Sequence, residues 1–158
     1  MSPAAAPVIA PLDPQTPQAL HLLACSDAYL GALYPAESNH LESADSLARP
    51  NVHFVGVWLD GRLAGCGAVK VLQDDTTYGE IKRVFVLPEH RGRGLSHALM
   101  DALEAHLTAQ GILLARLETG IHQPEALALY RARGYRTRLP FGQYQPDPLS
   151  VFMEKALR

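Results

Sequence analysis

The segment Arg91-Gly92-Arg93-Gly94-Leu95-Ser96-His97 stands between a predicted strand, Glu80 to Val86, and a predicted helix, Gly94 to Ala109. Its glycines allow backbone N–H groups to face a ligand closely, and the start of the helix adds unpaired N–H donors. The helix dipole contributes about half a positive charge at that end, which suits a phosphate. The segment predicts either an anion site or a tight strand-to-helix turn with solvated arginines.

This segment departs from two common phosphate-binding motifs. It lacks the Lys-Ser/Thr pair of a P-loop, and His97 stands where a GxGxxG motif needs its third glycine. An acidic partner for a ribose is also missing at the spacing that dinucleotide-binding domains use. A generic phosphate- or nucleotide-binding domain therefore remains only as a third alternative.

Upstream of this segment the residues follow the pattern of strands. Val52 to Leu59 and Arg62 to Leu72 are rich in strand-forming residues and flank Asp60-Gly61, a strong hairpin signal. Together with Glu80 to Val86 they predict an antiparallel meander. Nearer the N-terminus we predict a strand at Val8 to Leu12, a helix capped by Thr16 and stopped by Gly31, and a second helix from Ser38 to Ala48.

Downstream, helices and strands alternate. After Gly111 we expect a strand at Ile112 to Glu118, and then a helix that begins at Pro124 and ends before Gly134. The last strands are predicted at Tyr135 to Arg138 and at Ser150 to Lys155. This order predicts the α/β (α+β) class, with a central mixed, mostly antiparallel β-sheet flanked by helices.

Composition limits the class of protein. The 158 residues, 47% hydrophobic and 19% charged, suit a single globular domain over residues 1–158, with residues 1–7 disordered. A net charge of −2 gives no basic surplus for nucleic acid or an anionic membrane. No apolar run approaches the roughly 20 residues of a membrane span, and Met1–Pro7 does not resemble a signal peptide. We therefore expect a soluble, cytoplasmic domain.

The cysteines and histidines argue against two further kinds of site. Cys25 and Cys66 cannot form a disulfide framework, and none of the CxxC, HExxH or HxxxH spacings occurs. We therefore predict no metal. Cys66, within an apolar predicted strand, is expected to be a small buried side chain rather than a nucleophile.

Two motifs resemble those of the Gcn5-related N-acetyltransferase (GNAT) family. Arg91 to Ser96 is similar to its (Gln/Arg)-x-x-Gly-x-(Gly/Ala) motif, with Ser96 where Gly or Ala is usual. Val84 to His90 is similar to the strand and the Pro-Glu-(Tyr/His) approach before it, and Ala126 to Tyr135 resembles the later Ala-x-x-Leu-Tyr-x-x-x-Gly-(Phe/Tyr) motif. The resemblance covers Glu80 to Arg136 and implies the GNAT fold.

A narrower resemblance is to a bacterial subgroup labelled indole-acetate acetyltransferase-like. It is carried by these segments: Pro35 to His40, Leu63 to Ala68, Gly79 to Lys82, Leu117 to Gly120 and Pro140 to Met153. Indole-acetate itself offers no simple amine to acetylate. The label is therefore a poor guide to the acceptor.

The resemblance implies acetyl-CoA as the donor substrate of an N-acetyltransferase. The pyrophosphate would lie on N–H groups between Gly92 and His97, and the pantetheine arm would pair with the strand at Val84 to Val86. Gln123 aligns with a position where relatives often carry an Asn that bonds this arm. The implied cofactor-binding residues are Val84, Phe85, Val86, Arg91, Gly92, Arg93, Gly94, Leu95, Ser96, His97, Gln123 and Tyr130.

The same resemblance implies two catalytic residues, Tyr130 and Glu80. In the family such a tyrosine points its hydroxyl at the CoA sulfur, and a phenol is protonated at neutral pH. The alternative role of Tyr130 is packing. Glu80 or Glu118 could remove the proton of the acceptor, directly or through water, and we favour Glu80. For either carboxylate the alternative is a salt bridge with Arg83 or Arg116.

The acceptor is expected to bind variable segments outside these motifs. The predicted substrate-binding residues are Glu37, Ser38, His40, Glu118 and Tyr144. A carboxylate such as Glu37 suits a cationic amine, so we expect a small primary amine that attacks acetyl-CoA directly in a ternary complex. A protein or peptide N-acetyltransferase and a CoA-binding sensor without turnover stay open, although Tyr130 favours an enzyme over a sensor. A homodimer is also left open.

Overall fold

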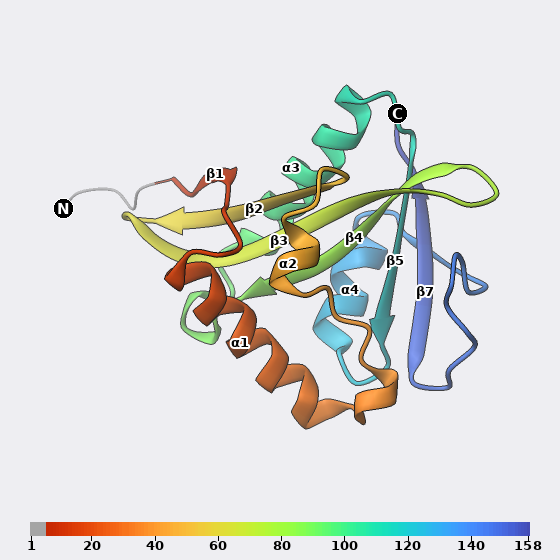
Figure 1. Cartoon of the computed structure of the whole chain (residues 1–158), viewed down its shortest axis with the longest axis horizontal. Coiled ribbons are helices and arrows are strands. Elements are labelled where there is room, and N and C mark those ends of the chain that lie inside the picture. Colours follow the sequence, from red (N-terminus) through yellow and green to blue (C-terminus); the bar gives the residue numbers. More distant parts are fainter. Residues whose placement is uncertain (1–5) are drawn as a thin grey trace.

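A seven-stranded sheet in the order β1-β2-β3-β4-β5-β7-β6 forms the centre of the computed structural model, which describes residues 6–158 (Figure 1). The predicted disorder of residues 1–7 falls largely on residues 1–5, which lie outside the described residues. The elements are β1 (Val8–Pro11), α1 (Pro17–Leu33), α2 (Ala44–Leu47), β2 (Val52–Leu59), β3 (Arg62–Gln73), β4 (Thr77–Val86), α3 (Leu95–Ala109), β5 (Leu114–Gly120), α4 (Pro124–Ala132), β6 (Arg136–Arg138) and β7 (Ser150–Ala156), with 3₁₀ turns at Ala36–Ser38 and Pro88–His90.

The sheet is mixed but mostly antiparallel, as the sequence predicts. Every neighbouring pair of strands is antiparallel except β4 and β5, which run parallel. The β2–β3 hairpin turns at Asp60-Gly61, where both residues have positive φ angles of 50° and 77°. That backbone is the one that Asp-Gly favours in a two-residue hairpin. The predicted fold class is confirmed.

Each face of the sheet is covered by helices. On one face Leu99, Leu103 and Leu107 of α3 are fully buried against a cluster that includes Val57 of β2. On the other face α1 packs on a second cluster, in which Cys66 of β3 is buried and its thiol donates to the Arg83 carbonyl at 3.3 Å. Burial raises the pKa of Cys66 to about 12. The expectation that Cys66 is a small buried side chain is therefore confirmed.

Two sequence-based boundaries were wrong. Helix α1 does not stop at Gly31 but continues to Leu33, and Tyr34 caps it by donating its N–H to the Leu30 carbonyl. The helix predicted from Ser38 to Ala48 is instead a 3₁₀ turn, an extended stretch and the four-residue α2. The reason is tertiary, because the carbonyls in that stretch accept hydrogen bonds from side chains of β4 rather than from helical N–H groups.

Strands β4 and β5 separate after a short paired region. Only Gly79–Ile81 of β4 pairs with Ala115–Leu117 of β5, although both strands continue beyond these residues (Figure 1). A bulge accompanies the separation, because the β3–β4 register shifts there and Arg83 has a φ of 59°. A positive φ is uncommon for a residue other than glycine. The divergence opens space between the two strands in the middle of the sheet.

No helix among residues 6–158 combines the length and the apolar character that crossing a membrane requires.

Candidate functional site

Two connected cavities fill the space between the diverging strands. The first, called the groove below, has a volume of about 450 Å³ and lies between the second half of β4, the loop before α3, and α4. The second, the inner cavity, has a volume of about 100 Å³ and lies between β4 and the end of β5. The residues that line both are Ser26, Leu30, Val84, Gln123 and Tyr130. These shared residues form the junction between the cavities.

The loop before α3 has the geometry of an anion site. Gly92 and Gly94 have φ angles of 79° and 75°, and Gly94 caps the N-terminus of α3. These left-handed conformations favour glycine, and the first N–H groups of a 15-residue helix are left without carbonyl partners. Because the groove reaches this loop, the helix start faces an open volume that an anionic group can occupy.

Arg91 shapes the wall of the groove. Its Nε donates to the Val86 carbonyl at 3.1 Å, and its guanidinium lies over the rings of Tyr29 and Phe85, at 5.3 and 5.7 Å from their centres. Arg93 is exposed and is absent from the residues that line the groove. The other predicted cofactor-binding residues line it: Val84, Phe85, Val86, Arg91, Gly92, Gly94, Leu95, Ser96, His97, Gln123 and Tyr130.

Tyr130 of α4 stands at the junction of the groove and the inner cavity. Its side chain is buried and its ring packs edge-on against Tyr135, with centres 5.8 Å apart. Burial, together with the negative charge of Glu118, raises the pKa of Tyr130 to about 12. The hydroxyl is therefore protonated at neutral pH and can donate a proton or a hydrogen bond to a group between the two cavities.

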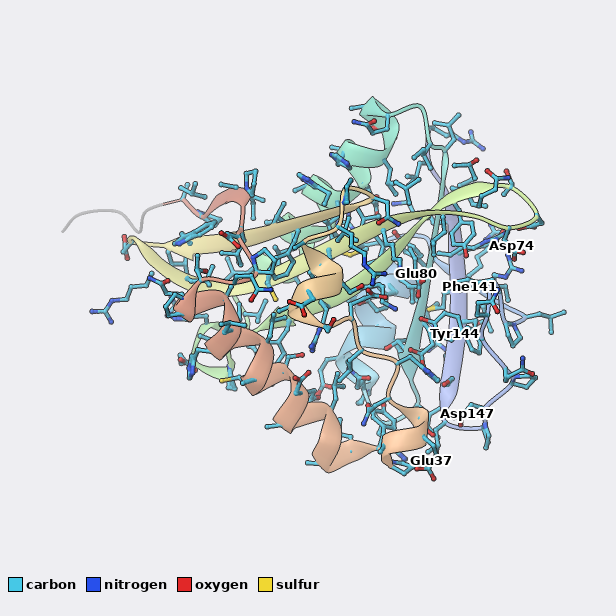
Figure 2. All side chains as sticks on the ribbon, viewed as in Figure 1. Glu37, Asp74, Glu80, Phe141, Tyr144 and Asp147 are labelled. Atoms are coloured by element: carbon cyan, nitrogen blue, oxygen red, sulfur yellow. The ribbon has the colours of Figure 1, made fainter. Side chains whose placement is uncertain are left out.

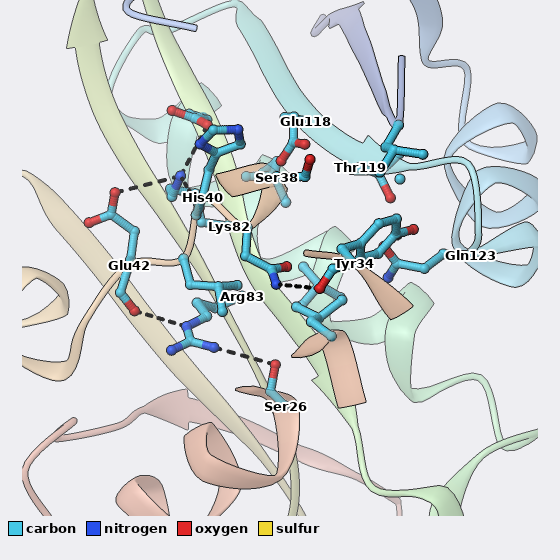
Figure 3. A pocket seen from close by; sticks show the side chains of 18 of the residues that line it. Ser26, Tyr34, Ser38, His40, Glu42, Lys82, Arg83, Glu118, Thr119 and Gln123 are labelled. Atoms are coloured by element: carbon cyan, nitrogen blue, oxygen red, sulfur yellow. Dashed lines mark hydrogen bonds and ion pairs between the residues drawn. The ribbon is translucent and has the colours of Figure 1, made fainter. Parts of the chain in front are cut away.

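Glu118 lies near the end of β5 and lines the inner cavity. Burial raises the pKa of Glu118 to about 7, against the smaller opposing effects of a hydrogen bond from the Ser150 hydroxyl, at 2.8 Å, and of the Lys82 charge. A carboxyl with this pKa can take up a proton near neutral pH and release it again. Glu118, labelled in Figure 3, and Tyr130 thus line the same small cavity.

Glu80 has different surroundings from Glu118. It is buried on β4, and its Oε2 accepts hydrogen bonds from the Tyr144 hydroxyl at 2.5 Å and from Lys82 Nζ at 3.2 Å. Glu80 thus forms a salt bridge, as the alternative role predicted, but its partner is Lys82 rather than Arg83 or Arg116. Arg83 leaves the bulge towards α1, where it pairs with Asp27, and Arg116 holds Asp75 through two hydrogen bonds.

Lys82 connects the segments on the far side of the inner cavity. Its ammonium contacts Glu80, the Tyr144 hydroxyl at 3.0 Å, Glu42 at 3.5 Å and the His40 carbonyl at 3.4 Å. One side chain of β4 therefore ties both the extended stretch before α2 and the loop before β7 to the sheet. Figure 3 shows Lys82 and Glu42 beside each other, with Arg83 bonded to the Glu42 carbonyl and to Ser26.

A third space, the outer cavity, has a volume of about 530 Å³ and lies on the other side of Lys82 and Tyr144. Glu37, His40 and Tyr144, which were predicted to bind substrate, line it. Ser38 lines the inner cavity instead and donates to Asp147 Oδ2 at 2.7 Å. All five predicted acceptor residues, Glu118 included, therefore line the inner cavity or the outer cavity.

The loop before β7 is held by its own apolar anchor. Phe141 is buried between Tyr78 and Phe152, and the Gly142 N–H donates to Asp74 Oδ2 at 3.0 Å. In the view of Figure 2, Asp74, Phe141, Tyr144 and Asp147 follow one another along one side of the molecule. These contacts place the Tyr144 hydroxyl against Glu80.

Three residues that line the inner cavity were not predicted from the sequence: Tyr34, Glu42 and Lys82. Tyr34 and Lys82 line the inner cavity and bond to segments far away in the chain. Their local sequence carries no sign of those partners, although Lys82 falls in one of the segments that resemble the bacterial subgroup. Among residues 6–158, no three His, Cys, Asp or Glu side chains come together in a group that could hold a metal ion.

Comparisons with known proteins agree with this geometry. Residues 19–135 match the model of the acetyltransferase (GNAT) family. A protein of Azospirillum brasilense named IAA acetyltransferase is 47% identical over 131 residues, which are 83% of this chain and 85% of that protein.

Solved structures show the same fold. A crystal structure of a Klebsiella pneumoniae protein assigned to the acyl-CoA N-acyltransferases is similar over 96% of this chain and 98% of that one, with a TM-score of 0.82 and 40% identity. The PaiA N-acetyltransferase of Thermoplasma acidophilum, solved in complex with coenzyme A, has a TM-score of 0.73 at 18% identity over 96% of this chain and 99% of that one. The chain described here is a member of the GNAT family of acetyltransferases.

Proposed function

We propose that this acetyltransferase moves the acetyl group of acetyl-CoA to the primary amine of a small molecule, by direct attack in a ternary complex. The observation that carries the proposal is that the groove and the outer cavity both adjoin the small inner cavity. The groove and the outer cavity approach the inner cavity from different sides, and Glu118 and Tyr130 line the inner cavity. A donor and an acceptor could therefore be bound at once, which a ternary complex requires.

The residues of the groove fit the donor. The N–H groups between Gly92 and His97 would hold the pyrophosphate, and the backbone of β4 at Val84 to Val86 would pair with the pantetheine arm as a further strand would. An N–H of the same strand would stabilise the oxygen of the thioester as negative charge develops on it. Arg91 supports this wall through its contacts with Val86 and Phe85. Arg93, which is exposed, would meet the phosphates only from solvent.

The contacts of the two carboxylates favour Glu118 as the base, although the sequence favours Glu80. Glu80 already accepts two hydrogen bonds, from Tyr144 and Lys82. Glu118 faces the inner cavity, and its pKa of about 7 leaves a large deprotonated fraction at neutral pH. It would take the proton of the ammonium group, directly or through water, so that the neutral amine can attack. Glu80 would then hold Tyr144 in place.

Tyr130 would serve the leaving group. Its pKa of about 12 keeps the hydroxyl protonated, and it stands where the groove enters the inner cavity. As the bond between the acetyl carbon and sulfur breaks, Tyr130 would donate its proton to the departing thiolate. The new amide nitrogen would then lose its extra proton through water to the Tyr130 phenolate, and the proton held by Glu118 would pass to solvent. The products are a neutral amide and free CoA, and both side chains return to their starting states.

The outer cavity favours a cationic acceptor. Glu37 and Asp147 line its rim, while the charges of Glu42 and Glu80 are balanced by Lys70 and Lys82. This surplus of carboxylates would attract an ammonium group and repel a carboxylate. The name of the A. brasilense relative points instead to a carboxylate acceptor, which the charge of this cavity does not favour.

A screen of acceptors with acetyl-CoA, read by release of free thiol, tests the proposal. The panel contains small primary amines, amino acids, lysine-containing peptides and indole-acetate. We expect release that depends on a small amine. Release with peptides alone would indicate a protein or peptide acetyltransferase, and release with none of them would favour a CoA-binding sensor.

A further inference from the structure

Tyr34, the residue that caps the C-terminus of α1, reaches into the turn between β5 and α4. Its side chain is buried, and its ring stacks on that of His122 with centres 5.4 Å apart. The turn leaves room for it only because residue 120 is glycine, since a Cβ there would lie 1.9 Å from the Tyr34 hydroxyl. Two segments distant in sequence are therefore fitted to each other around one phenol.

The hydroxyl of Tyr34 makes two hydrogen bonds in this turn. It accepts from the His122 N–H at 3.0 Å and donates to Oε1 of Gln123 at 3.2 Å. A tyrosine hydroxyl has one proton, and a buried proton needs an acceptor, which only the oxygen of the Gln123 amide supplies here. The orientation of the amide is therefore fixed, with Oε1 engaged and Nε2 directed elsewhere. Figure 3 shows Tyr34 and Gln123 side by side.

Gln123 lines both the groove and the inner cavity. A glutamine side chain has three rotatable bonds, and fixing it when a ligand binds costs conformational entropy. The bond from Tyr34 removes part of that cost before the ligand arrives. It also leaves the two N–H donors of Nε2 available to a carbonyl oxygen in the groove.

We propose that Tyr34 is a positioning residue for the donor substrate, which it serves by holding the Gln123 amide so that Nε2 donates to an amide carbonyl of the pantetheine arm. This inference rests on the proposed function, because it requires that the groove binds CoA. Glutamine is one methylene longer than the asparagine that relatives often carry at this position. The hydrogen bond from Tyr34 would restrain this extra length, so that the Gln123 amide can make the same contact with the pantetheine arm.

Calorimetric titration with CoA tests this role in a double-mutant cycle. Tyr34→Phe keeps the ring beside Gly120 and removes only the hydroxyl, so CoA should bind about 3- to 10-fold more weakly. Gln123→Met, which keeps the length of the side chain without its amide, should weaken binding at least as much. In the double variant the Tyr34→Phe change should have no further effect, because the group through which Tyr34 acts is already gone.

Two further variants separate positioning from a merely structural role. Gln123→Glu retains an oxygen for the Tyr34 proton but loses the N–H donors, so it should fold normally and also bind CoA weakly. Tyr135→Phe is the matched control, since it removes a buried hydroxyl that donates to Glu104 at 2.9 Å outside all three cavities. It should lower the melting temperature and leave the Kd for CoA unchanged. In turnover, Tyr34→Phe should raise the KM for acetyl-CoA with little change in kcat.

The outcomes separate a failure of the Tyr34 role from a failure of the proposed function. An unchanged Kd in a folded Tyr34→Phe variant, or effects of the two substitutions that simply add, would overturn the positioning role alone. Failure of the unmodified protein to bind CoA would overturn both the positioning role and the proposed function.

Discussion

The donor side and the acceptor side of the site are built in different ways. On the donor side, the loop from Gly92 to His97 and the edge of β4 would recognise their ligand through backbone N–H and C=O groups of regular elements. On the acceptor side, the residues that line the outer cavity come from loops that side chains such as Lys82 tie to the sheet. Under the proposed function, donor recognition would therefore depend on local geometry, and acceptor recognition would depend on contacts between distant segments.

The largest effect is expected at the donor loop. Gly94→Val places a β-branched residue at a φ of 75°, where the helix start must stay open to a phosphate. Strain in the loop and the added side chain should reduce CoA affinity by about 100-fold or more, which is the range expected when several charge-assisted hydrogen bonds are lost together. Calorimetry with CoA measures this effect.

Gly111→Val is the control for Gly94→Val. Gly111 follows the other end of α3, has a φ of 74° and, like Gly94, has no neighbour within 4 Å of an added Cβ. Both variants should therefore lose similar stability on heating, but only Gly94→Val should lose affinity. Equal affinities in the two folded variants would contradict the anion site.

Tyr130→Phe should affect chemistry rather than binding. The substitution keeps the ring that packs against Tyr135 and removes the proton at the junction of the groove and the inner cavity. If Tyr130 protonates the leaving thiolate, kcat should fall by about 100-fold or more, with the CoA Kd and the melting temperature little changed. Single-turnover kinetics checks this. Retention of most of the single-turnover rate would leave Tyr130 with a packing role only.

Glu118→Gln and Glu80→Gln form a matched pair of predictions at the boundary between the two sides. A base with a pKa of about 7 makes the rate rise with pH until about pH 7, and Glu118→Gln should remove this limb and lower kcat/KM by about 10- to 100-fold at pH 8. Glu80→Gln should preserve the limb. Loss of the acidic limb in Glu80→Gln alone would return the role of base to Glu80.

The same raised pKa predicts a change in stability with pH. Glu118 binds a proton more tightly in the folded state, with a pKa of about 7, than in the unfolded chain, with a value near 4.5. Folding stability therefore falls as the pH rises from about 4.5 to 7, by on the order of 2 kcal/mol from this group. Relative to the unmodified protein, Glu118→Gln should gain stability across that window. Denaturant unfolding of both proteins at pH 5 and at pH 8 measures this gain. If the difference in unfolding free energy between the two proteins were the same at both pH values, the pKa of Glu118 would not be raised.

The smallest effect is expected on the acceptor side. Tyr144→Phe removes the hydroxyl that donates to Glu80 and accepts from Lys82, but keeps the ring packed against Phe141 and His40. Both hydrogen bonds are lost, but neighbouring contacts still hold the loop, so the acceptor KM should rise by only about 3- to 10-fold. The KM for acetyl-CoA should stay the same. A change in the donor KM would show that the two sides are coupled through Tyr144.

The sequence predicted the local structure around the groove better than that around the outer cavity. The loop from Gly92 to His97 and the helix from Pro124 were found because glycine, proline and a short apolar repeat act over a few neighbouring residues. The proposed helix from Ser38 to Ala48 failed, because the carbonyls of His40 and Glu42 bond to β4. No local pattern reports such a bond.

The contacts of single side chains escaped prediction for the same reason. Lys82 bonds to His40 and Tyr144, which are 42 and 62 residues away, and Tyr34 bonds to Gln123 across 89 residues. The choice between Glu80 and Glu118 as the proposed base also depends on such contacts, because only the fold shows that Glu80 already bonds to Tyr144 and Lys82. Residue type alone cannot separate two strand glutamates.

The separation of β4 from β5 has a consequence for the stability of the whole chain. An unpaired strand edge is usually found at the rim of a sheet, whereas here it lies in the middle, beyond Ile81. If acetyl-CoA completes this edge, the ligand becomes part of the hydrogen-bonded sheet. Amide protons of β4 should then exchange with solvent more slowly as the CoA concentration rises, and the melting temperature should rise with it. The supply of donor would thus set the lifetime of the folded protein as well as its rate of turnover.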